Sequence, residues 1–384
     1  MRVLFDLISV QGRINGGAEY TKRVFEELCT VPGLKLYGLY NSGEVFKLEK
    51  FEYFSEKCLS VLDINNSGSI AEIVENNQID CVFIGIMQRY LGMDLEAIGC
   101  RVVVTIHDLG DQEIEDNSLY KLAHFEFDKK ASLHRWRIKM LMSIWGINII
   151  SKKNLSAFDA HKGFLLKDTT SIITDSDYSK WSIKYNIQYL GDKEINVLFP
   201  PLKTPAQVSE NKRIASLVKK GHPYFLVLSA ERWTKNVNIV FEVFKRVLED
   251  HPEYRLVTTG IKESLFPEHI ALPYTSAGEL EYVIKNAAAL VYASMMEGFG
   301  YPPLEAMKYG TPVICSNVTS LSEVACGGSI AFSPMYKTDL YRAFNEFLSS
   351  DRRMLRDKAY KWYEQVRARQ ESDLQGILKL ILEK

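Results

Sequence analysis

The sequence predicts an α/β protein of two halves, each built on a doubly wound parallel sheet. Three observations predict this fold. Short apolar runs recur along the chain, amphipathic stretches such as Ala18–Cys29 separate several of them, and the pattern restarts after a proline-rich segment. Strands of a buried parallel sheet are continuous apolar runs, and helices usually connect them. The 384 residues suffice for two domains, because a domain usually contains about 100–200 residues.

The proline-rich segment Phe199–Pro205 is the predicted domain boundary. We therefore expect a first domain at 1–199, a second at 200–360, and a C-terminal helix at 361–384 that can pack back on the first domain. The strands expected in the first domain are Val3–Ile8, Lys35–Tyr40, Cys81–Ile86, Arg101–Ile106, Ser171–Thr174 and Asn196–Phe199. Those expected in the second are Tyr224–Ser229, Arg255–Thr259, Ala289–Ser294, Pro312–Ser316 and Ile330–Ser333.

The end of each predicted strand is where function is expected, because ligands of open parallel sheets bind beyond the carboxyl ends of the strands. A helix in the second half supports the alternation of strands and helices. Ser276 and Glu279 have the spacing of a capping box and predict a helix that extends through Asn286.

The composition argues against several classes of function. The 47 Lys and Arg residues balance 48 Asp and Glu residues, so the net charge of −1 gives no reason to expect a nucleic-acid partner. The six cysteines form no C-x-x-C pair and no zinc-type spacing, so we expect no metal site, no disulfide framework and a reducing cytoplasm. The N-terminal run fits a first strand rather than a signal peptide, and no run of apolar residues predicts a membrane span.

The segment from Glu297 to Glu305 is the most informative candidate site. Its glycines and prolines exclude one continuous helix, and a proline at 302 or 303 suits a first helical turn. Glu305 then lies near the helix start, where a carboxylate can bind a ribose diol, and Glu297 lies in a loop whose glycine amides can approach a ligand. The alternative is a capping glutamate and a surface glutamate.

A second candidate follows the first strand of the second half, where Arg232 and Lys235 lie beside a predicted helix N-terminus. A departing diphosphate needs its negative charge neutralised, and without a metal an Arg fork and a Lys point charge can do this. The alternative is a solvated loop with incidental charges.

Two features of the first half are weaker candidates on their own. Gly16 and Gly17 precede a helix, so their amides can meet a phosphate or sugar, or they form an ordinary tight turn. His107 follows a strand and is either a ligand-facing imidazole or a satisfied structural residue.

Two further patterns were weighed. Asp175-Ser176-Asp177 superficially matches a D-x-D metal motif, but Arg232 and Lys235 already supply countercharge and Asp177 fits a helix start, so no metal is expected. The stretch 129–153 carries seven Lys or Arg residues among apolar ones and no acid. It is either a surface for an anionic membrane or a lipid-linked acceptor, or a core-packing helix with a solvated basic face.

Together these segments resemble the family-4 retaining glycosyltransferases of the GT-B fold, in which two Rossmann-like domains face each other across a cleft. The strongest match is Glu297-GFGYPPL-Glu305, continuing through Ala306–Ile314, which resembles the E-x7-E signature of that family. The other matching segments occur in the same order as in the family: Gly16–Glu19, Ile106–Asp108, Ile172–Ser176, and Arg232 with Lys235-Asn236.

The resemblance implies roles for individual residues. Arg232 and Lys235 would bind the donor diphosphate, Glu305 the ribose, and Glu297 with the amides of Gly298, Phe299 and Gly300 the transferred sugar. Gly16, Gly17 and His107 would reach donor and acceptor from the first domain, and Tyr274 and Thr275 would lie near the base. Glu297, His107, Arg232 and Lys235 form the expected catalytic set.

The resemblance thus implies a retaining, metal-independent hexosyltransferase without a cofactor. It would move a sugar from a UDP- or GDP-hexose to a glycan or lipid-linked acceptor of cell-envelope polysaccharide, in the cytoplasm or on the inner face of the membrane. Two alternatives stay open: a nucleotide-sugar epimerase of the same fold, and a catalytically silent subunit that binds a nucleotide sugar.

Overall fold

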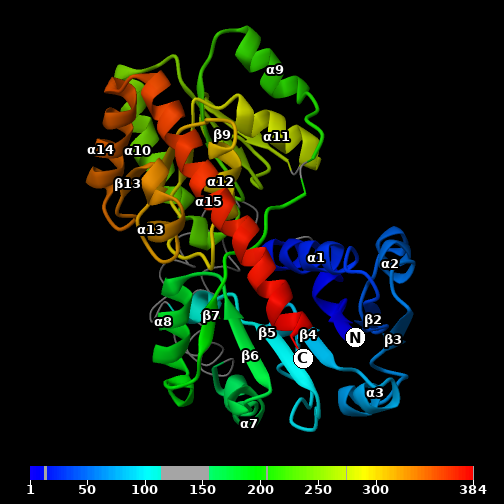
Figure 1. Cartoon of the computed structure of the whole chain (residues 1–384). Helices are drawn as coiled ribbons and strands as arrows, with labels where there is room; N and C mark the ends of the chain where they lie inside the picture. Colours follow the sequence, from blue (N-terminus) through cyan, green and yellow to red (C-terminus); the bar gives the residue numbers. More distant parts are fainter. Residues whose placement is uncertain (13–14, 114–154, 205, 274, 384) are drawn as a thin grey trace, which may run out of the picture. The chain divides into compact units, whose positions relative to one another are not determined.

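The computed structural model describes residues 1–384 except 13–14, 114–154, 205, 274 and 384. The chain divides into two compact units. Unit 1 comprises Met1–Leu109, Lys152–Thr204 and Ala368–Lys384, and unit 2 comprises Gly110–Ser151 and Pro205–Arg367. The boundary lies between Thr204 and Pro205, at the end of the proline-rich segment. Helix α15 (Arg352–Leu382) contributes residues to both units and begins well before residue 361, where the sequence placed it (Figure 1).

Unit 1 contains a seven-stranded parallel sheet in the order β3-β2-β1-β4-β5-β6-β7. Its strands are β1 (Arg2–Asp6), β2 (Lys35–Tyr40), β3 (Ser60–Asp63), β4 (Cys81–Ile84), β5 (Arg101–Thr105), β6 (Thr170–Thr174) and β7 (Ile195–Val197). The α-helices described between them are α1 (Gly16–Leu28), α2 (Leu48–Ser55), α3 (Ile70–Asn76), α7 (Lys162–Leu166) and α8 (Asp177–Asn186). Short 3-10 turns occupy Ile8–Val10, Met87–Arg89 and Gln188–Leu190.

Unit 2 contains a six-stranded parallel sheet in the order β10-β9-β8-β11-β12-β13. Its strands are β8 (Tyr224–Val227), β9 (Arg255–Thr259), β10 (His269–Leu272), β11 (Ala289–Tyr292), β12 (Val313–Ser316) and β13 (Ile330–Phe332). Its α-helices are α9 (Lys212–Lys219), α10 (Val237–Asp250), α11 (Ala277–Lys285), α12 (Tyr301–Met307), α13 (Leu321–Val324), α14 (Lys337–Ser349) and the first part of α15. Its 3-10 turns are Gly110–Glu113, Trp233–Lys235 and Cys326–Gly328.

Both sheets have a Rossmann-like order, which confirms the predicted fold class. In each sheet the order reverses beside the strand that comes first in the sequence, at β1/β4 in unit 1 and at β8/β11 in unit 2. Such a reversal opens a crevice at the carboxyl ends of the two strands. Strand interiors are buried, as the continuous apolar runs predict: Phe83, Val104, Leu226 and Val291 are within the hydrophobic cores.

The sequence missed the edge strands β3 and β10 and placed several strand ends too late. Leu7 and Ile8, for example, follow β1 in a turn rather than extending it. The predicted capping box is present, since Ser276 caps α11 and Glu279 returns a hydrogen bond to its backbone. Within the described ranges, every helix is too short or too polar to cross a lipid bilayer.

Candidate functional site

The crevice at β8 and β11 in unit 2 brings Lys235 and Glu297 together. Lys235 ends a 3-10 turn that follows β8, and Glu297 lies in the loop that follows β11. The Lys235 ammonium donates a hydrogen bond to Glu297 Oε1 and another to the Tyr292 hydroxyl, with 2.5 Å between Nζ and the phenol oxygen. Only 6% of the Lys235 side chain and 15% of the Glu297 side chain are exposed, so this is a nearly buried ion pair.

Polar contacts fix Glu297 from several sides. Ser294 Oγ lies 2.5 Å from the Oε1 atom of Glu297 and donates to it. The backbone N–H of Glu297 donates to Thr319 Oγ1 at 3.1 Å, and Ser320 Oγ donates to the Glu297 carbonyl at 2.8 Å. The carboxylate therefore has a defined position before any ligand binds, which is the preorganisation that an electrostatic site needs.

The electrostatics of the pair follow from burial. Burial lowers the pKa of the Lys235 ammonium, although the Glu297 carboxylate acts in the opposite direction. Burial also acts to raise the pKa of Glu297, but Lys235, Ser294 and Tyr292 outweigh it and hold the pKa of this carboxyl below its usual value. Glu297 is therefore ionised near neutral pH.

The loops around this pair adopt unusual backbone conformations. Ser229, Asn236 and Thr319 have positive φ angles of 52°, 50° and 52°, a region that residues with a Cβ seldom occupy. Gly300 has φ +98°, and a Cβ there would come 2.4 Å from Leu321 Cδ2, so glycine is required. Strained backbone of this kind costs about 1–3 kcal/mol per residue and is concentrated at functional sites.

The remaining residues predicted for the donor site surround the pair unevenly. Arg232 is exposed and caps the 3-10 turn that carries Lys235. Gly298, Phe299 and Gly300 are buried in the loop after Glu297. Glu305 is half-buried in α12, in its second turn rather than its first, because the helix begins at Tyr301 with the prolines just inside.

The residues suggested for the base are less informative. Thr275 is half-buried and directly precedes the cap of α11. Tyr274 lies outside the described residues, as does the basic stretch 129–153. Sequence reasoning missed Tyr292, Ser294 and Thr319, which hold the Lys235–Glu297 pair.

In unit 1, His107 follows β5 and binds Asp175, which follows β6. The imidazole Nδ1 lies 2.8 Å and 3.0 Å from the two carboxylate oxygens of Asp175, and Nε2 lies 3.0 Å from the Gly85 carbonyl oxygen. Gly17, in the first turn of α1, packs against the ring, since a Cβ on it would come 3.3 Å from His107 Nε2. Gly16 starts the same helix and is exposed.

The D-x-D segment has other roles in the structure. Asp175 holds His107, the Ser176 hydroxyl caps α8 by accepting from the backbone N–H of Ser179, and Asp177 starts that helix as the sequence predicted. The ranges that the structure describes contain no group of three His, Cys, Asp or Glu side chains arranged to hold a metal ion.

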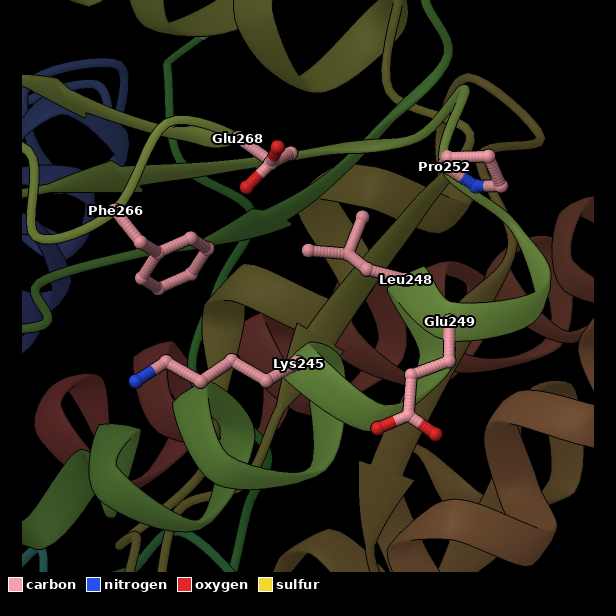
Figure 2. Close-up of a pocket in the computed structure, with 6 residues that line it drawn as sticks. All are labelled: Lys245, Leu248, Glu249, Pro252, Phe266 and Glu268. Atoms are coloured by element: carbon pink, nitrogen blue, oxygen red, sulfur yellow. The ribbon is translucent and has the colours of Figure 1, made fainter.

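A separate groove of about 350 Å³ lies at the other end of α10. Figure 2 shows its lining residues: Lys245, Leu248, Glu249, Pro252, Phe266 and Glu268. Lys235 directly precedes the N-terminal end of α10, and the 14 residues of that helix span about 21 Å. The groove is therefore distinct from the ion-pair site.

Comparison with known proteins identifies the segment that carries the pair. Residues 208–362 match the model of the family described as glycosyl transferases group 1. This segment is a glycosyl transferases group 1 domain. It contains both Lys235 and Glu297, and it includes every strand of the six-stranded sheet.

Curated relatives of this chain include two bacterial mannosyltransferases. O-antigen chain mannosyltransferase B of Escherichia coli is 42% identical over 86 residues, which make up 22% of this chain and 22% of the relative. O-antigen chain mannosyltransferase RfbU of Salmonella typhimurium is 25% identical over 237 residues, which make up 60% of this chain and 56% of the relative. The chain therefore spans about half of RfbU, at 56%, and less of the first relative.

Solved structures share the fold at low sequence identity. HepE of Anabaena, crystallised in complex with UDP-glucose, has a TM-score of 0.64 and 12% identity, covering 99% of this chain and 98% of that chain. Because this likeness extends over both units, the two Rossmann-like units of the chain correspond to the two domains of a GT-B fold, and the glycosyl transferases group 1 domain is the second of them.

Proposed function

We propose that this chain is a glycosyltransferase that moves a hexose from a nucleotide diphosphate donor to a glycan or lipid-linked acceptor. The donor binds the glycosyl transferases group 1 domain in unit 2, and unit 1 receives the acceptor. The reaction retains the anomeric configuration and requires neither a metal nor another cofactor. The enzyme acts in the cytoplasm, in part on the inner face of the membrane, in the synthesis of cell-envelope polysaccharide.

The buried Lys235–Glu297 pair at the β8/β11 crevice is the observation that carries the proposal. A lysine ammonium has three N–H donors, and Glu297 and Tyr292 accept two of them. The third is available to a phosphate oxygen. With the exposed Arg232 beside it, Lys235 supplies the positive charge that a departing diphosphate needs.

The proposed reaction is a front-face displacement. The acceptor oxygen forms a bond to the anomeric carbon while the bond between that carbon and the phosphate oxygen breaks. The electron pair leaves with the diphosphate, whose oxygen accepts the proton of the acceptor hydroxyl. Glu297 orients the sugar and stabilises its developing positive charge, and Glu305 binds the ribose hydroxyls.

The names of the relatives suggest which sugar to test first. O-antigen chain mannosyltransferase B and RfbU are mannosyltransferases by name, whereas HepE was crystallised with UDP-glucose. We therefore propose mannose as the transferred sugar and treat a glucosyl donor as the competing case.

A thermal-shift panel tests the donor site directly. UDP, GDP and ADP and their mannose and glucose conjugates are added with EDTA present, since a ligand at 100 times its dissociation constant stabilises a protein by about 2.7 kcal/mol. We expect one nucleotide family to raise the melting temperature of the native chain but not of Lys235→Ala or Glu305→Ala. Lys245→Ala, in the groove of Figure 2, is the matched control and should respond like the native chain.

The panel has outcomes that contradict the proposal. No shift with any nucleotide favours a structural role. A shift that EDTA abolishes contradicts metal independence. Binding without transfer to any glycan acceptor indicates a silent subunit, and conversion of the sugar nucleotide without an acceptor indicates an epimerase.

A further inference from the structure

The His107 imidazole lies between two groups that only accept hydrogen bonds. The Asp175 carboxylate faces Nδ1 at 2.8 Å and 3.0 Å, and the Gly85 carbonyl oxygen faces Nε2 at 3.0 Å. The carbonyl is itself fixed, because the backbone N–H of Gly85 donates to the buried carboxylate of Asp6 at 2.9 Å. Both ring nitrogens therefore meet oxygens whose positions are set by neighbouring strands.

A neutral imidazole cannot satisfy this arrangement. It carries one N–H and one nitrogen lone pair, so one of the two oxygens would face a lone pair at hydrogen-bond distance. An imidazolium has two N–H groups and can donate to both. Since only 14% of the His107 side chain is exposed, water cannot readily replace either partner, and the doubly protonated form is favoured.

We propose that Asp175 is a positioning residue that keeps His107 doubly protonated, so that His107 acts as a fixed positive charge and not as a proton acceptor. The surroundings of the ring fit this role. Tyr20 from α1 contacts the ring with centroids 4.9 Å apart, and Asp108 and Asp175 are the charged groups that act on it. Burial acts to lower the pKa of His107, but Asp175 outweighs it and raises this pKa above its usual value.

The proposal separates two uses of a histidine in a sugar-transfer site. Its kinetic part rests on the proposed function, in which an oxygen of the departing diphosphate accepts the proton of the acceptor hydroxyl. A permanent cation at His107 contributes by electrostatics and fails as it loses its proton. A histidine that serves as general base has the opposite pH dependence, since it fails as it gains a proton.

Nitrogen NMR of the full-length protein tests the protonation state without any assay of activity. The His107 signals are identified among the seven histidines by their loss in His107→Gln. We expect both ring nitrogens of His107 to be protonated at pH 7. In Asp175→Asn, which keeps an acceptor oxygen but removes the charge, the titration midpoint of His107 should shift to lower pH. Asp177→Asn, an exposed neighbour in the first turn of α8, should leave it unchanged.

A neutral His107 at pH 7 in the native protein, or a midpoint that is the same in Asp175→Asn, would overturn the proposal. The kinetic test measures kcat/KM of the same variants between pH 6 and pH 9. We expect the loss caused by Asp175→Asn to grow with pH, whereas a purely structural defect gives the same loss at every pH. A chain without transferase activity would refute the proposed function, and the NMR result would still decide the protonation of His107.

Discussion

Each unit places a charged pair at the carboxyl edge of its sheet, and the two pairs differ in how fully their hydrogen bonds are used. In unit 1, both ring nitrogens of His107 are engaged by Asp175 and Gly85. In unit 2, Lys235 has two partners for three N–H donors. The first pair is saturated and the second retains a donor.

The difference assigns the pairs to different tasks. A saturated cation can act on a ligand only through its field, because it has no hydrogen bond left to give. An ammonium with a remaining donor can bind a phosphate oxygen directly, and its burial strengthens that interaction because the local dielectric constant is low. The ligand-binding role is therefore expected to depend most strongly on unit 2.

Lys235→Ala should have the largest effect, because it removes the charge that faces the leaving group. We expect kcat to fall by about 100- to 1,000-fold, as for the loss of a group that stabilises charge in a transition state. Steady-state kinetics with the donor identified by thermal shift measure this. Lys245→Ala in the Figure 2 groove is the control and should keep native turnover. Native turnover in Lys235→Ala would mean that the pair has no part in the chemistry.

Tyr292→Phe should have a smaller effect, because it removes one acceptor from Lys235 and leaves the charge in place. The phenol oxygen lies 2.5 Å from Lys235 Nζ, and loss of a hydrogen bond to a charged group is worth about 1.5 kcal/mol. We therefore expect a decrease in kcat of about tenfold, since 1.4 kcal/mol corresponds to a factor of ten. Tyr336→Phe, an exposed tyrosine, is the control.

The double variant tests whether Tyr292 acts through Lys235. If it does, Lys235→Ala/Tyr292→Phe should be no slower than Lys235→Ala, because the two residues form one coupled unit. Additive losses would show that Tyr292 has an independent role.

The sequence predicted the two-unit fold and the ion pair from local patterns. Continuous apolar runs located most strands, and the residues just after them included both Lys235 and Glu297. It missed β3 because that four-residue edge strand is only partly buried, and β10 because a buried polar residue, His269, begins it. A short or interrupted apolar run gives a weak strand signal.

The partners of the charged groups were beyond sequence reasoning because they are distant along the chain. Thr319 is 22 residues from the Glu297 that it holds, and Asp175 is 68 residues from His107. Asp175 was considered only as part of a local metal motif with Asp177, whereas the fold pairs it across two neighbouring strands. A one-residue neighbourhood does not reveal such a contact.

The smallest expected effect is the pH dependence of stability that the His107–Asp175 pair contributes. The folded-state pKa of His107 is raised above its ordinary value of 6.5. The stabilisation is therefore fully present below pH 6.5 and is lost as the pH rises through the raised value. Melting temperatures of the native protein and Asp175→Asn should differ more at pH 6 than at pH 9, whereas Asp177→Asn should show no such trend. A difference that is constant with pH would mean that Asp175 stabilises unit 1 without controlling the charge of His107, and the contrast between a saturated cation in unit 1 and a ligand-binding cation in unit 2 would then fail.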